Sequence, residues 1–158
     1  RQGIPDYLVT MRKPGQNEKP VKGELSEFVG ENAPRMVDDK TRNSIEIWQR
    51  YASPVWMDIR ASRTLQKESA REDKDERHIC PLQLDVIDRA LQLWSMPGDV
   101  VFSPFMGIGS EGFEAVKTGR KFIGTELKSS YFQQAQLNLK AAQELSRVQG
   151  GLFNDQDA

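Results

Sequence analysis

The chain has 158 residues, the size of one ordinary domain that can bury a hydrophobic core. Its 22 basic and 23 acidic residues give a net charge of −1, so the overall charge gives no support for non-specific nucleic-acid binding. The single cysteine excludes an internal disulfide, and no apolar run approaches the roughly 20 residues that span a bilayer. The sequence opens on Arg1 without a methionine or a signal-peptide pattern, so we expect a fragment or a processed product with no membrane partner.

The N-terminal half is polar and irregular. Its one strand signal covers residues 6–11 and is ended by the Lys-Pro-Gly sequence at 13–15. The mixed charge run over 67–77 is expected to be a solvated loop or an exposed helix. Between 44 and 57, by contrast, the apolar residues are too numerous for a disordered linker.

Aromatic and basic side chains occur together in this region. Trp48, Tyr51 and Trp56 could stack on nucleic-acid bases, but a small core beneath an insert is the favoured interpretation. Arginines spaced through the same region could contact phosphates. These are Arg42, Arg50, Arg60 and Arg63.

The C-terminal half alternates helix and strand signals. A helix is predicted to start at Pro81 and to stop at Pro97-Gly98. The residues from Val100 to Phe102 form a short strand whose consecutive apolar side chains predict burial on both faces, as in a parallel sheet. A second helix is predicted over 110–118 and is closed by Gly119.

The next strand is predicted over 121–126, and Ser129 or Ser130 can cap a long helix after it. Residues 150–158 have the composition of a frayed polar tail. The apolar residues at helical spacing are Leu82, Val86, Ala90, Leu93 and Trp94 in the first helix, and Tyr131, Ala135, Leu139, Ala142 and Leu145 in the last. A strand–helix–strand unit of this length implies a right-handed parallel crossover, and therefore an α/β fold with a nucleotide-type site at the strand ends.

A glycine-rich turn lies between the first strand and the second helix. Residues 107–112, Gly-Ile-Gly-Ser-Glu-Gly, fit the pattern Gly-x-Gly-x-x-Gly, which alone is weak evidence but stands where a cofactor-binding turn must lie. Glu126 follows at the end of the next strand, where a carboxylate accepts hydrogen bonds from both ribose hydroxyls of an adenosine. The alternative is a turn selected only for helix–strand packing, with Glu126 a surface charge. The register of loop, helix and acid favours an adenosine-containing cofactor, either NAD or S-adenosylmethionine.

Four segments resemble motifs of the DNA amino-methyltransferases, the family that modifies adenine N6 or cytosine N4. Val-Phe-Ser-Pro-Phe-Met-Gly-Ile-Gly-Ser at 101–110 resembles their motif I, which typically reads Asp-Pro-Phe-x-Gly-x-Gly-Thr. The segment 119–128, followed by Tyr131, is similar to motif II, and His-Ile-Cys-Pro-Leu-Gln at 78–83 resembles motif X, which packs around the methionine end of the cofactor. Residues 6–14 resemble the closing strand of motif VIII.

The motif order is similar to that of the beta class of this family, which runs from catalytic half to recognition region to cofactor half. The resemblance implies a partial Rossmann-like, S-adenosylmethionine-dependent methyltransferase sheet with an irregular recognition insert. It divides the chain into a closing strand (1–14), a target-recognition insert (15–77), an S-adenosylmethionine-binding α/β part (78–148) and a disordered tail (149–158). The implied cofactor-binding residues are His78, Cys80, Pro81, Ser103, Pro104, Phe105, Met106, Gly107, Gly109, Ser110, Glu126, Leu127 and Lys128.

The resemblance also implies the partners and setting of the chain. The substrate would be double-stranded DNA, with adenine N6 favoured over cytosine N4 by family frequency alone. The source would be a bacterium or a phage with a restriction–modification system, and the location would be cytoplasmic. The chain would act with an upstream catalytic half of the same protein or with a complementary subunit, and a homodimer is compatible with the pattern.

Two departures from the family pattern matter. The aspartate at the head of motif I is Ser103 here, so cofactor binding would depend on the backbone and Glu126. No two prolines are adjacent in the sequence, so the Asp-Pro-Pro-Tyr motif that holds the flipped base is absent. No catalytic residue is therefore assigned, and the isolated chain is expected to be inactive. A non-catalytic remnant or split subunit is one alternative, and a fragment of an NAD-dependent oxidoreductase is a less favoured one.

His78 and Cys80 have a further interpretation that we disfavour. One histidine and one cysteine cannot form a zinc site by themselves, so no metal is expected. Methyltransferases that attack the cytosine ring place a Pro-Cys pair after a strand, whereas Cys80 here precedes Pro81 at a helix start. Packing at the entry of a helix, compatible with lining the cofactor pocket, is the favoured interpretation of both residues.

Overall fold

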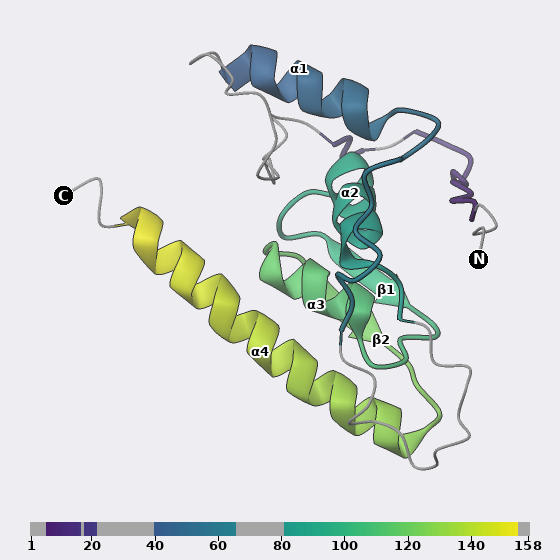
Figure 1. Ribbon diagram of the computed structural model, residues 1–158, viewed down its shortest axis with the longest axis vertical. Coiled ribbons are helices and arrows are strands. Elements are labelled where there is room, and N and C mark those ends of the chain that lie inside the picture. Colours follow the sequence, from purple (N-terminus) through teal and green to yellow (C-terminus); the bar gives the residue numbers. More distant parts are fainter. Residues whose placement is uncertain (1–5, 17, 22–39, 66–80, 155–158) are drawn as a thin grey trace.

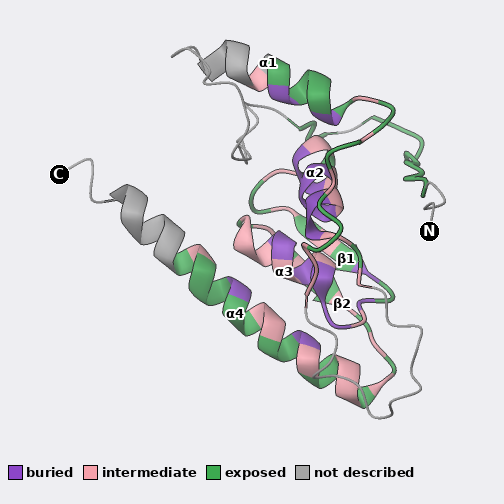
Figure 2. Cartoon of the chain, in the orientation of Figure 1, coloured by how far each residue is buried: buried purple, intermediate pink, exposed green. Residues whose placement is uncertain are grey.

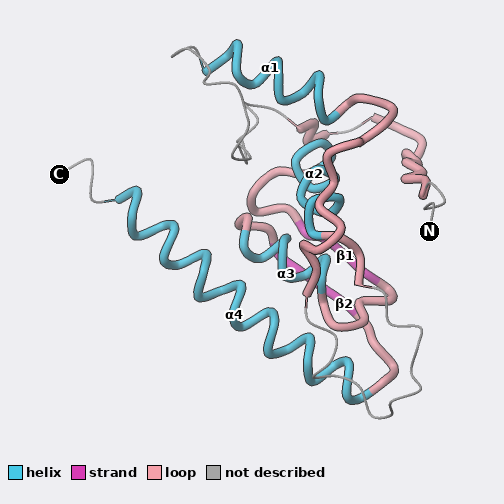
Figure 3. Tube along the Cα trace, viewed as in Figure 1, coloured by secondary structure: helices cyan, strands magenta, loops and turns pink. Residues whose placement is uncertain are grey.

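The computed structural model describes residues 6–16, 18–21, 40–65 and 81–154. In chain order its elements are α1 (Lys40–Tyr51), α2 (Leu84–Trp94), β1 (Val100–Ser103), α3 (Ser110–Lys117), β2 (Lys121–Gly124) and α4 (Ser129–Asn154), as Figure 1 shows. The two strands pair in parallel, and α3 lies between this sheet and α4 (Figure 3). The predicted α/β unit of alternating strands and helices is therefore confirmed. None of the described helices is both long and apolar enough to cross a membrane.

The two-stranded sheet is covered on one face only. Val101 pairs with Phe122, and both pack against the core that α2 and α3 form. On the other face, Val100, Phe102 and Ile123 are 57%, 59% and 57% exposed. The prediction that β1 is buried on both faces is therefore wrong for this chain, because the described elements cover only the face that carries Val101.

Helix α2 begins three residues after Pro81, at Leu84. Gln83 at the N-cap is extended, with ψ 130°, and the backbone N–H of Leu84 donates to the carbonyl of Arg63 at 2.8 Å. The helix ends before Pro97, where Ser95 is again extended. The predicted helix is confirmed, but its start lies one turn later than Pro81.

The buried face of α2 differs from the predicted one. Leu84, Ile87 and Leu91 form the core with Ala115 of α3. Burial of each leucine or isoleucine side chain contributes roughly 2 kcal/mol to folding. The predicted apolar face, in contrast, is only partly buried at Val86, Ala90 and Leu93 and exposed at Leu82 and Trp94. Packing against α3 and the sheet selects the neighbouring face, and Figure 2 shows the buried residues concentrated on α2 and α3.

The ends of α3 and α4 follow the sequence signals in part. Gly119 closes α3 with a left-handed φ of 78°. The long helix α4 is confirmed, but Ser129 is its first residue and not its cap, because the N–H of Phe132 donates to the carbonyl of Lys128. Ala135 and Ala142 of α4 are fully buried. The tail expected from residue 149 is instead helical up to Asn154, because a helix that is already formed gains one hydrogen bond for each residue added. The last turns of α4 extend beyond the other elements (Figure 1).

The N-terminal residues 6–16 form no helix or strand. Tyr7 and Met11 within them are 85% and 88% exposed, so the strand expected over 6–11 is not formed. A strand needs a hydrogen-bonded neighbour, and the described sheet contains only β1 and β2. The charge run at 67–77 and most of the expected recognition insert lie outside the described residues, so the domain boundaries stay predictions.

Helix α1 and the segment after it carry the aromatic residues of the N-terminal half. Ile47 and Tyr51 are buried, and the guanidinium of Arg89 lies 5.0 Å from the ring centre of Tyr51 and 5.3 Å from that of Trp56. The indole N–H of Trp56 donates to the carbonyl of Tyr51 at 2.9 Å. The small core favoured for these aromatics is thus present at Tyr51 and Trp56, whereas Trp48 is 56% exposed.

Buried ion pairs fasten the segment around Arg60 and Arg63 to α2 and α3. Both arginines contact Oδ1 of Asp85 at 2.7 Å, and the other end of the Arg63 guanidinium contacts Glu114 at 2.8 Å. Lys117 also lies 3.2 Å from Glu114, whose side chain is completely buried. Burial raises the pKa of Glu114 despite these cations. Burial acts in the same direction on the pKa of Asp85. The hydrogen bonds from Arg60 and Arg63 outweigh it, however, and hold the pKa of Asp85 well below its usual range.

The arginines considered as phosphate contacts therefore have acidic partners inside the chain. Arg60 and Arg63 are engaged as described, and Arg50 lies 3.4 Å from Asp58. The side chain of Arg42 lies outside the described residues. Hydrogen bonding and the charge of Arg89 lower the pKa of Asp58, in spite of its partial burial.

Replacing Arg63 by methionine is expected to destabilise the fold by about 3 kcal/mol, because the buried carboxylate of Glu114 loses one of its two cationic partners and Asp85 loses one of its two arginines. Urea unfolding followed by circular dichroism measures the change. The matched control is Arg50→Met, whose pair with Asp58 is exposed at both ends and contributes about 1 kcal/mol or less. Equal losses in the two variants would contradict a special role for the buried pair.

Candidate functional site

The loop from β1 to α3 is held by backbone hydrogen bonds to the end of β2. The N–H of Thr125 donates to the carbonyl of Ser103 at 3.0 Å, and the N–H of Met106 donates to the carbonyl of Thr125 at 3.0 Å. The hydroxyl of Thr125 donates to the carbonyl of Pro104 at 2.6 Å. The loop therefore has a fixed position relative to the sheet before any ligand is considered.

Two glycines give the loop its course. Gly107 and Gly109 have φ values of 53° and 86°, in the left-handed region that other residues adopt at a cost. A Cβ atom at Gly109 would also lie 3.1 Å from Cβ of Ala135 in α4, whereas one at Gly107 would meet nothing within 4 Å. Gly112 is different, because a Cβ there would lie 2.6 Å from the ring of Phe122. Packing alone explains Gly112, while Gly107 faces open space that a ligand can approach.

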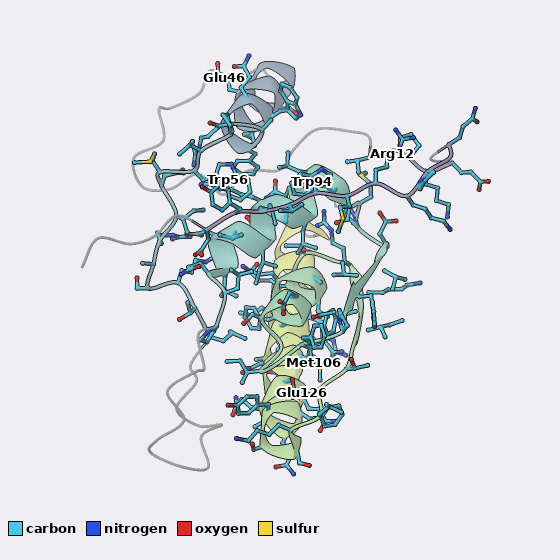
Figure 4. The ribbon with its side chains drawn as sticks, turned by 90° about the vertical axis from the view of Figure 1, so that its right-hand side faces the viewer. Arg12, Glu46, Trp56, Trp94, Met106 and Glu126 are labelled. Carbon is cyan, nitrogen blue, oxygen red and sulfur yellow. The ribbon has the colours of Figure 1, made fainter. Side chains whose placement is uncertain are left out.

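The side chain of Glu126, two residues after β2, binds the backbone of the loop. Its Oε2 accepts a hydrogen bond from the backbone N–H of Gly107 at 2.9 Å, and its Oε1 accepts one from the N–H of Lys128 at 2.9 Å. Figure 4 shows Glu126 close to Met106, toward the opposite end of the molecule from Glu46 of α1. Each carboxylate oxygen retains a free lone pair in this arrangement, so the group can still accept hydrogen bonds from a ligand.

A cavity of about 260 Å³ opens beside the loop. It is bounded by the segment before α2, by the loop itself, by the first turn of α3 and by the start of α4. The residues that line it are Pro81, Leu82, Phe105, Met106, Gly107, Ile108, Ser110, Glu111 and Tyr131. A largely apolar cavity with a few polar groups is the usual form of a small-molecule site.

The cavity brings together about half of the described residues that the sequence predicted for the site. Those that line it are Pro81, Phe105, Met106, Gly107 and Ser110. Ser103 is buried at the end of β1 and does not line the cavity. Pro104 and Gly109 belong to the loop and Glu126 binds its backbone, but none of the three lines the cavity. His78 and Cys80 lie outside the described residues.

Two further predicted residues lie after Glu126. Leu127 is fully exposed. Lys128 does not line the cavity, but its ammonium lies 4.5 Å from the ring centre of Tyr131, a cation–π contact with one of the lining residues.

Sequence reasoning missed Leu82, Ile108, Glu111 and Tyr131 as lining residues. A signal for Glu111 was available, because the first turn of a helix after a glycine loop faces any ligand bound to that loop. Burial raises the pKa of the Glu111 carboxyl group, against a smaller opposing effect of its own backbone. Within the described residues, no group of three or more histidine, cysteine or acidic side chains is arranged to hold a metal ion.

The parallel strands, the glycine turn and the acid after β2 together define an α/β nucleotide-type site. Comparison with known proteins makes the class specific. A family model described as DNA methylase matches residues 5–137 of this chain. The chain belongs to this N6/N4 DNA methylase family, and this membership replaces the oxidoreductase alternative.

Individual relatives match over shorter stretches. The chain is 41% identical over 58 residues to the type II methyltransferase M1.MboII of Moraxella bovis, which is 37% of this chain and 22% of that relative. It is 35% identical over 81 residues to the DNA adenine methyltransferase YhdJ of Escherichia coli (strain K12), covering 48% of this chain and 28% of that relative. The chain thus spans less than a third of the length of these curated relatives.

Solved structures match in part as well. One is the complex of M1.HpyAVI with SAM, at 33% identity and a TM-score of 0.38, covering 40% of this chain and 31% of that one. Another is the putative DNA modification methylase TTHA0409 from Thermus thermophilus, solved with S-adenosyl-L-methionine, at 24% identity and a TM-score of 0.48 over 71% of this chain and 40% of that one.

Gly109→Ala tests the geometry of the loop. The left-handed φ should cost about 1 kcal/mol, and contact with Ala135 should cost about 1 kcal/mol more. Gly98→Ala is the matched control, because Gly98 has a φ of 89° but open space around it. Thermal unfolding of both variants should show the larger loss for Gly109→Ala; an equal loss would contradict close packing of the loop on α4.

Proposed function

We propose that this chain is the S-adenosylmethionine-binding part of a DNA methyltransferase that modifies an exocyclic amine, adenine N6 being favoured. The observation that carries the proposal is the loop from Ser103 to Ser110, fixed on β2 and closed by Glu126, beside a cavity of about 260 Å³. Family membership supports the choice of cofactor, and M1.HpyAVI was solved as a complex with SAM.

The residues present fit such a ligand. Each oxygen of the Glu126 carboxylate has a lone pair left over, and these would accept hydrogen bonds from the two ribose hydroxyls. The open space at Gly107 lets the ligand approach the backbone. Pro81, Met106 and Tyr131 supply apolar walls to the cavity. When bound there, S-adenosylmethionine supplies an activated methyl group, and these side chains orient it and exclude water from one side.

The acceptor base must be held by another polypeptide segment. The family's Asp-Pro-Pro-Tyr motif does not occur in the 158 residues. We infer that a catalytic half, encoded upstream or as a separate subunit, supplies that motif and the contacts to double-stranded DNA.

The uncovered face of the sheet supports the proposal that a separate catalytic half docks on this cofactor-binding part. Val100, Phe102 and Ile123 form a row of exposed apolar side chains on it. Both β1 and β2 have one unpaired edge within the described sheet. Parallel sheets are normally covered on both faces, and unpaired strand edges readily accept a further strand.

Calorimetric titration with S-adenosylmethionine or its demethylated product tests the binding proposal. The chain should bind both, and Glu126→Gln should weaken binding about tenfold or more, because a hydrogen bond to a charged group contributes about 1.5–3 kcal/mol. The midpoint of thermal unfolding should also fall, by the equivalent of about 1 kcal/mol, since the single glutamine oxygen can accept from Gly107 or from Lys128 but not from both.

Glu144→Gln on the exposed side of α4 is the matched control for this titration. Folded wild-type protein that binds neither ligand would refute the function. Unaltered affinity in Glu126→Gln would refute only the role assigned to that carboxylate.

Methyl transfer to DNA tests the need for a partner. The chain alone should transfer no methyl group, and adding the polypeptide encoded upstream of Arg1, or a subunit that carries Asp-Pro-Pro-Tyr, should restore transfer to adenine. Phe102→Asp should lower the restored rate at limiting concentrations about tenfold or more, because docking would bury a charge without a partner.

Leu137→Asp is the control for this assay, because Leu137 is an exposed apolar residue on α4, away from the sheet face. If the mixture gains no activity, the chain is a non-catalytic remnant that binds cofactor or DNA. If transfer goes to cytosine N4 instead, the preference for adenine is wrong.

A further inference from the structure

The cavity beside the loop contains a single carboxylate, that of Glu111. The other lining residues are apolar, glycine, a serine or a tyrosine. Glu111 stands in the first turn of α3, directly after the loop residues Gly109 and Ser110. An acid in this position gives the cavity a negative charge that the backbone of the loop does not supply.

The carboxylate of Glu111 has no cation to neutralise it among the described residues. It forms none of the ion pairs of the described chain, in contrast to Glu114 one turn later, which has Arg63 and Lys117. Burial is the main influence on its pKa, which is raised, and no neighbouring positive charge counteracts it. A partly buried carboxylate without a partner is costly, and a ligand that carries a positive charge would relieve that cost.

We propose that Glu111 binds the α-ammonium group of the methionine part of S-adenosylmethionine. This inference rests on the function proposed above and adds a second anchoring carboxylate to it. Glu126 accepts a hydrogen bond from Gly107 within the glycine turn, whereas Glu111 follows the turn in the first turn of α3. The two acids would therefore hold the two ends of the ligand, with Glu126 on the ribose and Glu111 on the amino acid.

The ammonium group fits this carboxylate better than the sulfonium centre of the same ligand. An ammonium donates three hydrogen bonds, and a desolvated carboxylate needs donors as well as charge. A sulfonium has no N–H or O–H to donate. Ser103 stands where the motif I pattern has an aspartate, so Glu111 is the acid that this loop offers to the cavity.

Calorimetric titration of Glu111→Gln with three ligands tests the assignment. S-adenosylmethionine carries both positive centres, S-adenosylhomocysteine keeps only the ammonium, and methylthioadenosine has neither. The substitution should weaken binding of the first two about tenfold, because it removes the charge from a charge-assisted hydrogen bond. Affinity for methylthioadenosine should not change, and Glu144→Gln should leave all three affinities as in the wild type.

The other outcomes overturn the assignment. Weakening for S-adenosylmethionine alone would place the sulfonium at Glu111, and equal weakening for all three ligands would mean that the residue only shapes the cavity. Unchanged affinities would remove Glu111 from the site while leaving the proposed function intact. Wild-type protein that binds none of the three ligands would refute the proposed function itself, and this inference with it.

The pH dependence of binding gives a second readout. Protonation of Glu111 removes the charge that the ammonium needs, so wild-type affinity for S-adenosylhomocysteine should fall as the pH is lowered toward the raised pKa of this group. Glu111→Gln should lose that dependence. A variant with the same pH profile as the wild type would overturn the assignment.

Discussion

The described fold depends on how the buried carboxylate of Glu114 is neutralised. Its side chain has no exposed surface, and a buried charge is tolerated only with partners that replace its hydration. Arg63 supplies one partner and reaches Asp85 of α2 with its other end, while Lys117 supplies a second. Because Arg63 comes from outside the α/β unit, this one side chain joins the N-terminal half to both α2 and α3.

That junction also determines where the site lies. Arg63 accepts the first N–H of α2 through its carbonyl, so the segment before α2, which contains Pro81, has a fixed end point. Pro81 forms one wall of the cavity and the start of α3 forms another. The distance between these two walls therefore depends on the ion pairs that Arg63 forms with Asp85 and Glu114. A substitution at Arg63 or Glu114 would change the cavity although neither residue lines it.

The sequence was sufficient for the order of the elements from α2 to α4 and for the glycine turn, because these have local signals. Gly119, for example, stops α3 through its left-handed backbone conformation. Choices that depend on distant neighbours were not predictable. Packing against α3 decides which face of α2 is buried. Phe102 is exposed because no second layer among the described elements covers its side of the sheet. Residues 6–11 form no strand because no neighbouring strand in the described sheet pairs with them. Glu111 was missed because a single acid in a helix resembles any solvated charge until a cavity is seen beside it.

The strands that carry the open sheet face also hold the cofactor loop. β1 leads directly into the loop at Ser103, and hydrogen bonds from Thr125, Met106 and Gly107 hold the loop to β2 and the residues after it. A partner that covers Phe102 and Ile123 would reduce the motion of both strands, and so hold the loop more firmly in the position that binds the ligand. Since coupling between two binding events is reciprocal, cofactor binding would then strengthen docking of that partner by the same factor. If the partner is the proposed catalytic half, the methyl donor itself would contribute to assembly.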